Sequence, residues 1–472
     1  MTFSFPSSPR TLFQKIWDGH VVDGGTDALV AIDRIWLHER TGGVALTSLA
    51  ESGRTIAEPA NVFVTLDHVV DTLPGRTDET IMPTGSEFIR VTRDAALAAG
   101  LTFFDLDDER QGIIHVISPE QGVVLPGVTL VCPDSHTCTQ GAFGALAWGI
   151  GSTEAEHALA TMTLNLVRPQ TMRISVGGVL GGDVQAKDLA LYVISQIGSA
   201  GARGHVIEFA GSAIEALSIE GRMTLCNMAA EMGAFSAIIA PDAKVFEYLN
   251  GRPYAPKGSD WDAALESWQD LSSDDGATFD AEFAFDAADV APMVSWGTNP
   301  QQSAPFGLAP ASGKAADGDA RSLDYMDVSA NQPVAGLPIG GAFIGSCTNA
   351  RFEDLEIAAR VLKGRKVADG VRAICVPGSG GVKRRAEDAG IDLVFREAGF
   401  EWREPGCSMC FFVGGESFGE GERVISSTNR NFENRQGAGT RTHIASPASV
   451  AASAVLGRIA SVRELEELEA VR

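Results

Sequence analysis

Short runs of β-branched and apolar residues alternate with longer helical patterns, and this alternation constrains the fold more than any other feature of the chain. The strand-like runs are residues 205–211, 236–240, 341–347 and 372–379. The helical patterns are residues 186–198, 221–234, 351–364 and 381–390. Strands separated by helices predict parallel sheets that helices cover on both faces, so the predicted fold class is α/β. Ligands of such sheets bind beyond the carboxyl ends of the strands.

The length of 472 residues, with 44% hydrophobic residues, is enough for more than one core. Domains usually contain roughly 100 to 200 residues, which predicts about two to four of them here. Residues 297–322 are rich in Pro, Gly, Ala and Ser without periodicity, as is typical of a linker, and a weaker break lies at residues 198–204. We therefore predict three domains, at residues 1–198, 199–320 and 321–472.

Targeting signals and the number of cysteines indicate the cellular compartment of a protein. No run approaches the ~20 apolar residues of a membrane span, and the first residues lack the pattern of a signal peptide. The seven cysteines are few and odd in number for a chain of this length, unlike the framework of a secreted disulfide protein. These features predict a cytoplasmic protein whose thiols are reduced and available for metals.

The formal net charge of −24 opposes binding to nucleic acids and to anionic membranes, because both are negatively charged. An anionic substrate would require a local group of arginines. Residues 427–443 contain one, with Arg430, Arg435 and Arg441 among asparagines and glycines. Such a stretch is either a solvated loop or an anion site, and its composition alone leaves both interpretations open.

Cys407 and Cys410 form a C-x-x-C pair in "EPGCSMCFF". Such a pair is compatible with a redox dithiol, half of a zinc site or part of an iron–sulfur site. A third cysteine, Cys347, ends a predicted strand about sixty residues earlier among small residues, which suits an iron–sulfur cluster best. The remaining cysteines are scattered and complete no zinc motif; they are Cys132, Cys138, Cys226 and Cys375. A non-catalytic iron–sulfur protein for electron transfer or iron sensing and a zinc-stabilised binding module stay open at this point.

Six motifs, taken in chain order, resemble the aconitase superfamily. They are "TLDHVV", "CPDSHTCTQGAFGALAWGIGSTEAEH", "GRMTLCNMAAEMGA", "IGSCTNARFEDL", "PGCSMC" and "STNRNFENRQG". Within the superfamily the chain is most similar to the large subunits of 3-isopropylmalate dehydratases, also called isopropylmalate isomerases. The resemblance covers nearly the whole chain, from "LFQKIWDGHVV" near the start to "SPASVAASAVLG" near the end.

The resemblance implies three aconitase-type α/β domains with mainly parallel sheets around a central iron–sulfur site, without the swivel domain. It implies one [4Fe–4S] cluster per chain, held by Cys347, Cys407 and Cys410, with one iron lacking a protein ligand. Such an iron can withdraw charge from a hydroxyl as its bond to carbon breaks. The implied hydro-lyase reaction interconverts 2-isopropylmalate and 3-isopropylmalate through isopropylmaleate, in leucine biosynthesis. The alternative is the same chemistry on another substituted malate, such as citramalate, dimethylmalate or homocitrate.

The resemblance also implies the residues of the site. The catalytic acid, base and hydrogen-bonding groups are Asp67, His68, His115, Asp134, His136 and Glu231. The substrate-binding residues are His38, Ser135, Asn227, Asn429, Arg430 and Arg435. A guanidinium fork suits a carboxylate, so an acidic protein can bind a dicarboxylate through the arginines. We interpret His20, His157, His205 and His443 as structural.

The chain departs from the family pattern at several positions. Pro133 precedes Asp134 where a glycine is usual, Gln140 replaces a common histidine, and Asn434 replaces a usual glycine. The stretch after Cys410 also differs. These departures concern the side group of the substrate and leave the cluster cysteines in place.

The segment after His443 is too short for another domain, which usually needs at least roughly 50 residues. In the superfamily a fourth, mobile domain closes over the cluster and brings a serine base and further arginines. The isopropylmalate enzymes carry this domain on a separate small subunit. We therefore expect an obligate heteromer in which a small subunit completes the site.

Overall fold

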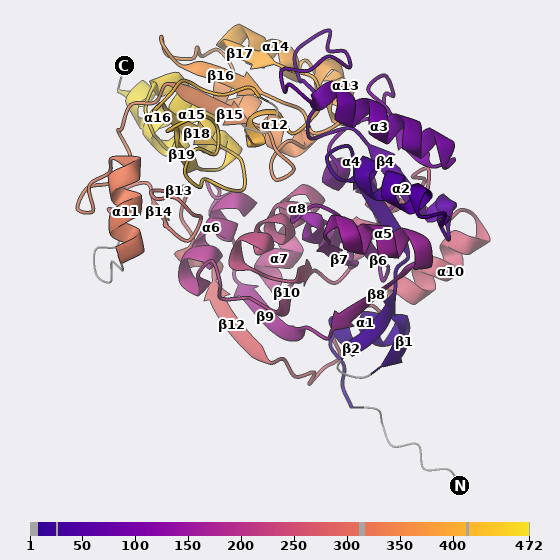
Figure 1. Cartoon of the computed structure of the whole chain (residues 1–472). Helices are drawn as coiled ribbons and strands as arrows, with labels where there is room; N and C mark the ends of the chain where they lie inside the picture. Colours follow the sequence, from indigo (N-terminus) through magenta and orange to yellow (C-terminus); the bar gives the residue numbers. More distant parts are fainter. Residues whose placement is uncertain (1–7, 25–26, 311–316, 412–414, 472) are drawn as a thin grey trace.

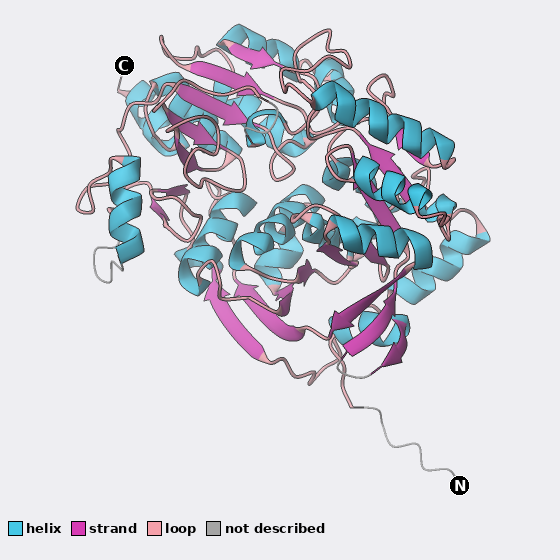
Figure 2. Ribbon diagram, in the orientation of Figure 1, coloured by secondary structure: helices cyan, strands magenta, loops and turns pink. Residues whose placement is uncertain are grey.

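The computed structural model describes residues 8–24, 27–310, 317–411 and 415–471. Three sheets dominate this part of the chain, with strand orders β5-β4-β3-β6-β7, β11-β10-β9-β12 and β17-β16-β15-β18-β19. Every strand pairing within them is parallel. Helices flank the sheets (Figure 2). The predicted α/β class with mainly parallel sheets is therefore confirmed.

The first sheet contains β3 (Arg34–His38), β4 (Val62–Thr65), β5 (Thr102–Phe104), β6 (Thr129–Cys132) and β7 (Leu146–Gly149). The second contains β9 (Gln170–Gly177), β10 (His205–Ala210), β11 (Ser236–Ile238) and β12 (Ala281–Asp286). The third contains β15 (Gly341–Ile344), β16 (Arg372–Cys375), β17 (Phe400–Trp402), β18 (Arg423–Ser426) and β19 (Arg441–Ile444). Two smaller antiparallel sheets are formed by β1 (Val21–Gly24), β2 (Asp27–Ala31) and β8 (Thr163–Val167), and by β13 (Met293–Ser295) and β14 (Ser303–Pro305).

The α-helices before the third sheet are α1 (Leu12–His20), α2 (Gly42–Glu51), α3 (Gly85–Ala98), α4 (Ile114–Gln121), α5 (Ser152–Thr161), α6 (Ala186–Ile197), α7 (Ser212–Ala216), α8 (Ile219–Met228), α9 (Ala243–Leu249), α10 (Ser259–Trp268) and α11 (Asp317–Met326). Those that follow are α12 (Phe352–Leu362), α13 (Gly380–Asp388), α14 (Ile391–Ala398), α15 (Pro447–Leu456) and α16 (Val462–Ala470). Short 3-10 helices are η1 (Pro59–Asn61), η2 (Thr137–Phe143), η3 (Ala229–Met232), η4 (Ala287–Asp289) and η6 (Ser408–Cys410).

The eight segments used for the fold prediction have the expected structure. The strand-like runs form β10, β11, β15 and β16, and the helical patterns form α6, α8 with η3, α12 and α13. The pattern at residues 221–234 is interrupted, because the α-helix ends at Met228 and the chain continues as η3 until Gly233, whose φ is 73°. A left-handed glycine is a common helix end.

Residues 297–322, predicted as a linker, contain β14 and the start of α11. Strand β9 lies before the predicted boundary at residue 198 and pairs with β10, which lies after it. The domain boundaries themselves stay predictions. No helix within the described residues is long and apolar enough to cross a membrane.

The first and second sheets share one hydrophobic core, which joins Trp36 and Phe63 of the first to Ile174 and Phe209 of the second. The third sheet, whose place Figure 1 shows, has a core of its own. The third core also includes Ile113 and Val116 at the start of α4, and the Ile113 amide donates to Gly378 O over 2.8 Å. The segment around α4 therefore holds the third sheet against the first.

Helix α1 is joined to the turn before β3 by His20. Its Nδ1 lies 2.7 Å from Ile16 O and its Nε2 lies 2.8 Å from Asp33 Oδ2. Both ring nitrogens face acceptors, so both must carry hydrogen and the ring is a cation. Burial lowers the pKa of His20, but the hydrogen bonds to Asp33 and Ile16 outweigh it and raise the pKa above 6.5. The pKa of Asp33 is correspondingly lowered, because His20 outweighs the effect of burial.

We expect His20→Gln to lower the free energy of unfolding by about 1 kcal/mol near pH 6. The raised pKa of His20 means that its contribution is complete below pH 6.5 and is lost as the pH rises through the folded-state pKa. The two proteins should therefore converge in stability by about pH 9. Urea unfolding at a series of pH values measures this, with His157→Gln at an exposed position as control. Stability curves that stay parallel from pH 6 to 9 would contradict the assignment.

Candidate functional site

Most residues predicted for the site follow directly after strands. They are His38 at the end of β3, Asp67 and His68 after β4, Asp134 to His136 after β6, Cys347 after β15, Cys407 and Cys410 after β17, and Asn429 and Arg430 after β18. His115, Asn227 and Glu231 come from α4, α8 and η3. The carboxyl ends of parallel strands are where α/β proteins bind ligands, and hydrogen bonds join these residues across all three sheets.

Two asparagines donate to Cys347, and one of them, Asn227 of α8, joins the second and third sheets there. Asn227 Nδ2 lies 3.2 Å from Cys347 Sγ, and Asn429 Nδ2 lies 3.5 Å from the same sulfur. Arg435 Nη2 donates to Cys410 Sγ over 3.5 Å. Cys347 and Cys410 are buried, and all three candidate cysteines are free thiols. N–H groups that point at sulfur stabilise thiolates and tune iron–sulfur clusters.

The backbone beside the cysteines is held in an unusual conformation. Ser346 directly precedes Cys347 with a φ of 77°, and Ser408 directly follows Cys407 with a φ of 47°. Residues other than glycine rarely adopt this left-handed region, and such strain concentrates at functional sites. Ser346 Oγ lies 3.2 Å from Cys410 Sγ, so the strained turn also joins two of the three cysteines.

The donor set fits a polynuclear cluster better than a single ion. Among the described residues, the one group of candidate ligands with atoms all within 4.8 Å of one another contains none of the three cysteines. Thiolates that bind different irons of one cluster must lie farther apart than ligands of one ion. Burial raises the pKa of Cys347 to about 12 and that of Cys407 well above its usual range. These thiols therefore need a bound metal to ionise near neutral pH.

A chain of carboxylates and imidazoles lies beside the cysteines. His68 Nδ1 lies 2.6 Å from Asp67 Oδ1, and His68 Nε2 lies 3.1 Å from Asp134 Oδ2. The other oxygen of Asp134 lies 3.0 Å from His115 Nε2. His115 Nδ1 is buried and has no hydrogen-bond partner among the described residues. Such an orphaned nitrogen in a polar site is available to a ligand.

The two carboxylates keep His68 protonated. Burial lowers its pKa, but Asp67 and Asp134 outweigh it and raise the pKa well above 6.5. Burial likewise raises the pKa of Asp134, yet His115, His136 and His68 hold it well below its usual range. A cation shared by two carboxylates is a stored proton in a site with little solvent.

His38 stacks on His68, with ring centroids 4.0 Å apart. Its Nε2 lies 3.1 Å from Pro133 O, and its Nδ1 accepts from the Arg40 amide over 3.3 Å. One nitrogen donates and the other accepts, so the ring is neutral. Burial and the charge of His68 lower its pKa to about 4. The structure thus pairs a neutral imidazole with a protonated one.

A second group contains His136, Glu231, Arg430 and Ser135. Glu231 Oε1 lies 2.9 Å from His136 Nε2 and accepts from Arg430 Nε over 2.7 Å. Arg430 Nη1 donates to Ser135 Oγ over 3.1 Å. His136 contacts Asp134 as well as Glu231, because its amide donates to Asp134 Oδ1 over 2.7 Å and its Nδ1 lies 3.7 Å from the same oxygen.

Arg435 is buried against two aromatic rings. Its guanidinium lies 4.7 Å from the ring centre of Phe411 and 5.0 Å from that of Phe432. It also donates to Asn429 Oδ1 over 3.4 Å. These cation–π contacts and the hydrogen bond to Asn429 hold the guanidinium in place.

Sequence reasoning did not select Lys187, which is fully buried in the first turn of α6. Its Nζ donates to Ser427 O over 2.9 Å and to Thr428 O over 2.8 Å, directly before Asn429. Burial lowers its pKa to about 7. A lysine inside the apolar pattern "AKDLALYVI" was the signal that could have identified it.

Two departures from the family pattern are accommodated by the backbone. Pro133 contributes its backbone carbonyl, which accepts a hydrogen bond from His38. The missing N–H of proline therefore does not affect this contact. Asn434 has a φ of 65°, and asparagine tolerates this left-handed region better than other non-glycine residues. Gln140 is fully buried in η2, and its side-chain N and O have no hydrogen-bond partners among the described residues. Nothing in the structure explains Gln140.

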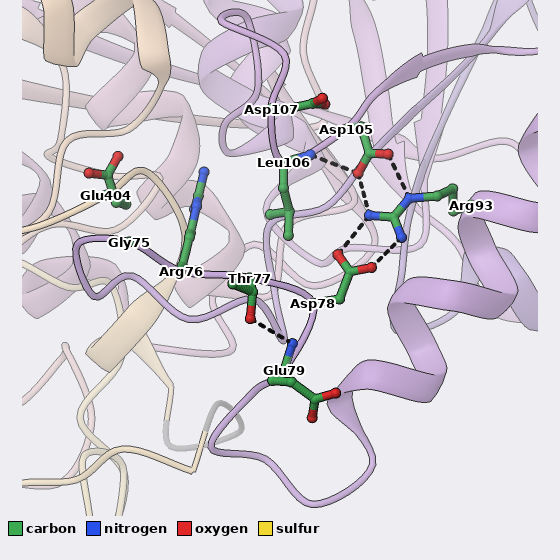
Figure 3. A pocket seen from close by; sticks show the side chains of 10 residues that line it. All are labelled: Gly75, Arg76, Thr77, Asp78, Glu79, Arg93, Asp105, Leu106, Asp107 and Glu404. Carbon is green, nitrogen blue, oxygen red and sulfur yellow. Dashed lines mark hydrogen bonds and ion pairs between the residues drawn. The ribbon is translucent and has the colours of Figure 1, made fainter.

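The surface beside the Cys407 loop contains a cavity of about 820 Å³ (Figure 3). Arg93 bridges Asp78 and Asp105 there, with its Nη2 2.8 Å from Asp78 Oδ1 and 2.7 Å from Asp105 Oδ1. Arg76 lines the same cavity and donates to Gln111 Oε1 over 2.6 Å. Both arginines are hydrogen-bonded to neighbouring side chains. None of the residues predicted for the site lines this cavity.

A family model and a solved structure show what the chain is similar to. The model of the family described as "Aconitase family (aconitate hydratase)" matches residues 14–457. Among solved structures, the chain is similar to the crystal structure of Thermococcus kodakaraensis aconitase X in its holo-form. That similarity has 12% sequence identity and a TM-score of 0.47, and it covers 89% of this chain and 87% of the other.

We expect Asn434→Ala to be less stable than Asn434→Gly by about 1 kcal/mol. Both substitutions remove the hydrogen bond from the Gly439 amide to Asn434 Oδ1, so their difference isolates the strain of the left-handed backbone. Urea unfolding of the two variants measures that difference. Equal stability of the two variants would contradict this explanation.

Proposed function

The chain belongs to the aconitase family of hydro-lyases, and from this premise we propose that it is the large subunit of an isopropylmalate isomerase. The proposed reaction interconverts 2-isopropylmalate and 3-isopropylmalate through isopropylmaleate. The observation that carries the proposal is the meeting of three cysteines, two arginines and an Asp–His–Asp chain at the carboxyl ends of strands. These groups offer cluster ligands, carboxylate contacts and an acid, which a dehydration of a 2-hydroxy dicarboxylate requires in addition to a base.

Cys347, Cys407 and Cys410 would hold the [4Fe–4S] cluster that is typical of the family. Their free thiols, with N–H donors on the sulfurs of Cys347 and Cys410, support this assignment. When bound, such a cluster supplies Lewis-acid chemistry at the iron that has no protein ligand. The protein's own residues bind the substrate and handle the protons.

Arg430 and Arg435 are proposed to bind the substrate carboxylates. The side chain of Arg430 is 31% exposed, so its guanidinium can reach a ligand while Glu231 and Ser135 hold it in place. Arg435 is fixed by Phe411 and Phe432. Both arginines and Asn429 lie in one segment, which gives a dicarboxylate a local positive field inside an acidic protein.

His68 is proposed as the general acid. Dehydration removes a C–H proton with a base and releases the hydroxyl as water, so the acid must provide one proton to the leaving oxygen. His68 carries that proton because Asp67 and Asp134 raise its pKa well above 6.5. Rehydration on the adjacent carbon returns the proton to His68. A positioned acid typically contributes 10²–10⁴-fold to the rate.

We propose that the general base comes from a partner. Burial raises the pKa of Asp67, Asp134 and Glu231, but their histidine partners outweigh it and lower all three, so these carboxylates are weak bases. The isopropylmalate enzymes that the chain resembles carry a serine base and further arginines on a small subunit. We therefore propose a heteromer in which such a subunit completes the site and reads the side group of the substrate.

The central experiment is an anaerobic assay of the reconstituted chain, alone and with its co-expressed partner. Absorbance of the unsaturated intermediate is followed with isopropylmalate, citramalate, dimethylmalate and homocitrate as substrates. We expect turnover of isopropylmalate that depends on the partner. Faster turnover of another substrate would replace the substrate assignment, and absence of turnover with all four would contradict the reaction class. Full activity of the isolated chain would contradict the partner's role.

The cysteine assignment has a matched control. We expect Cys407→Ser to abolish both the colour of the cluster and activity, because it removes one ligand. Cys375→Ser should keep both, since Cys375 is fully buried at the end of β16, outside the proposed ligand set. Iron and sulfide analysis with visible absorbance measures the cluster independently of turnover. A Cys375→Ser protein without cluster beside a Cys347→Ser protein that retains it would refute the ligand set.

A further inference from the structure

Glu39, the residue after β3, is fully buried and was not selected by sequence reasoning. Its Oε2 accepts from the Asp67 amide over 3.0 Å. Its Oε1 accepts from the amides of His68, over 2.7 Å, and Val69, over 2.5 Å. Three successive backbone N–H groups of one turn therefore converge on one carboxylate. Consecutive N–H groups arranged in this way form an anion-binding concavity, and here the anion is a side chain of the protein itself.

The position of Glu39 follows from the sheet. Strands β3 and β4 are parallel neighbours, and His38 is in register with Thr65. The chain leaves both strands at the same edge, so the residue after His38 lies beside the turn that begins two residues after Thr65. Thr92 Oγ1 donates to Glu39 O over 3.2 Å and helps to hold this backbone from the side of α3.

The turn that Glu39 holds carries two functional connections. Asp67 Oδ1 faces His68 Nδ1, and Asp67 O accepts from the Cys407 amide over 2.8 Å. The orientation of the His68 ring and the place of the Cys407 loop both depend on the backbone of residues 67–69. Glu39 touches neither of them through its own side chain.

A metal ion is not the explanation for this cluster of groups. The ligand atoms of His38, Glu39, Asp67 and His68 lie within 4.8 Å of one another. However, the carboxylate of Glu39 accepts three N–H groups, and both nitrogens of His68 donate to carboxylates. A metal would have to displace these bonds, so the arrangement is complete without one.

We propose that Glu39 is a positioning residue whose carboxylate fixes the backbone of residues 67–69 and, through it, the imidazole of His68 and the loop of Cys407. The effect on the backbone stands on the geometry alone. The effect on catalysis rests on the proposed function.

The test uses Glu39→Gln, which keeps the shape but replaces one acceptor oxygen with a donor that faces backbone N–H groups. Hydrogen–deuterium exchange of the full-length chain, measured by mass spectrometry on peptides that cover residues 62–73, reports on these amides. We expect exchange at residues 67–69 to become about tenfold faster, the factor for loss of one net hydrogen bond. The control is Thr92→Val, which removes a hydrogen bond to the carbonyl of Glu39 and should leave these amides protected.

Activity of the reconstituted enzyme provides the second readout. Glu39→Gln should lower kcat about 10- to 100-fold, as loss of an outer hydrogen-bond partner commonly does. KM should change little, because Arg430 and Arg435 are carried by a different segment. Glu39→Asp keeps the charge on a shorter side chain, so its exchange rate and its kcat should lie between those of the wild-type protein and Glu39→Gln. Glu39→Asp replaces Glu39→Gln in the test if Glu39→Gln does not fold.

Unchanged exchange at residues 67–69 in Glu39→Gln, or in Glu39→Asp where it replaces that variant, would overturn the inference. Equal effects of Glu39→Gln and Thr92→Val on exchange and on kcat would also overturn it, because they would indicate a general packing role. If the wild-type protein converts none of the four substrates, the proposed function fails. The exchange comparison still decides the role of Glu39 in that case.

Discussion

The site depends on the contact between the turn after β4 and the loop after β17. The Cys407 amide donates to Asp67 O over 2.8 Å, and the Glu404 amide donates to Thr72 O over the same distance. These bonds join the first sheet, which provides the imidazoles, to the third sheet, which provides the cysteines. Asp67 and Thr72 are buried, so their carbonyl groups need hydrogen-bond partners, and the loop after β17 provides them. The remaining residues of the site take their places around this junction.

Charge pairing accounts for the protonation states of the buried histidines. His68 is a cation between two carboxylates, whereas His38, stacked on it, is neutral. Removing one partner of a buried pair costs about 3–5 kcal/mol, because the other charge is left uncompensated. Asp67 and Asp134 therefore stabilise the protonated form of His68, and its positive charge in turn compensates their negative charges. Stability of the site and storage of its proton have the same physical cause.

Neighbouring groups also hold the two arginines that give this acidic chain a local positive charge. Arg430 and Arg435 follow β18, and the backbone just before them is held by Lys187 of α6. Glu231 and Ser135 fix one arginine, and two aromatic rings fix the other. Because both guanidinium groups are held before any ligand arrives, little side-chain entropy is lost on binding a carboxylate. The proposed binding of an anionic substrate at this point is therefore compatible with the formal charge of −24.

The sequence by itself determined the strand and helix periodicity, and hence the parallel sheets, because side-chain spacing follows local backbone geometry. It also placed Cys347 at a strand end and identified the arginine-rich segment. The tertiary structure decided that the ring of His136 bonds to Glu231, and that Glu39 and Lys187 support the site. These partners are separated by 28 to 241 residues in the chain, and their pairing depends on how the sheets pack. No local pattern encodes a contact that exists only after separate sheets have met.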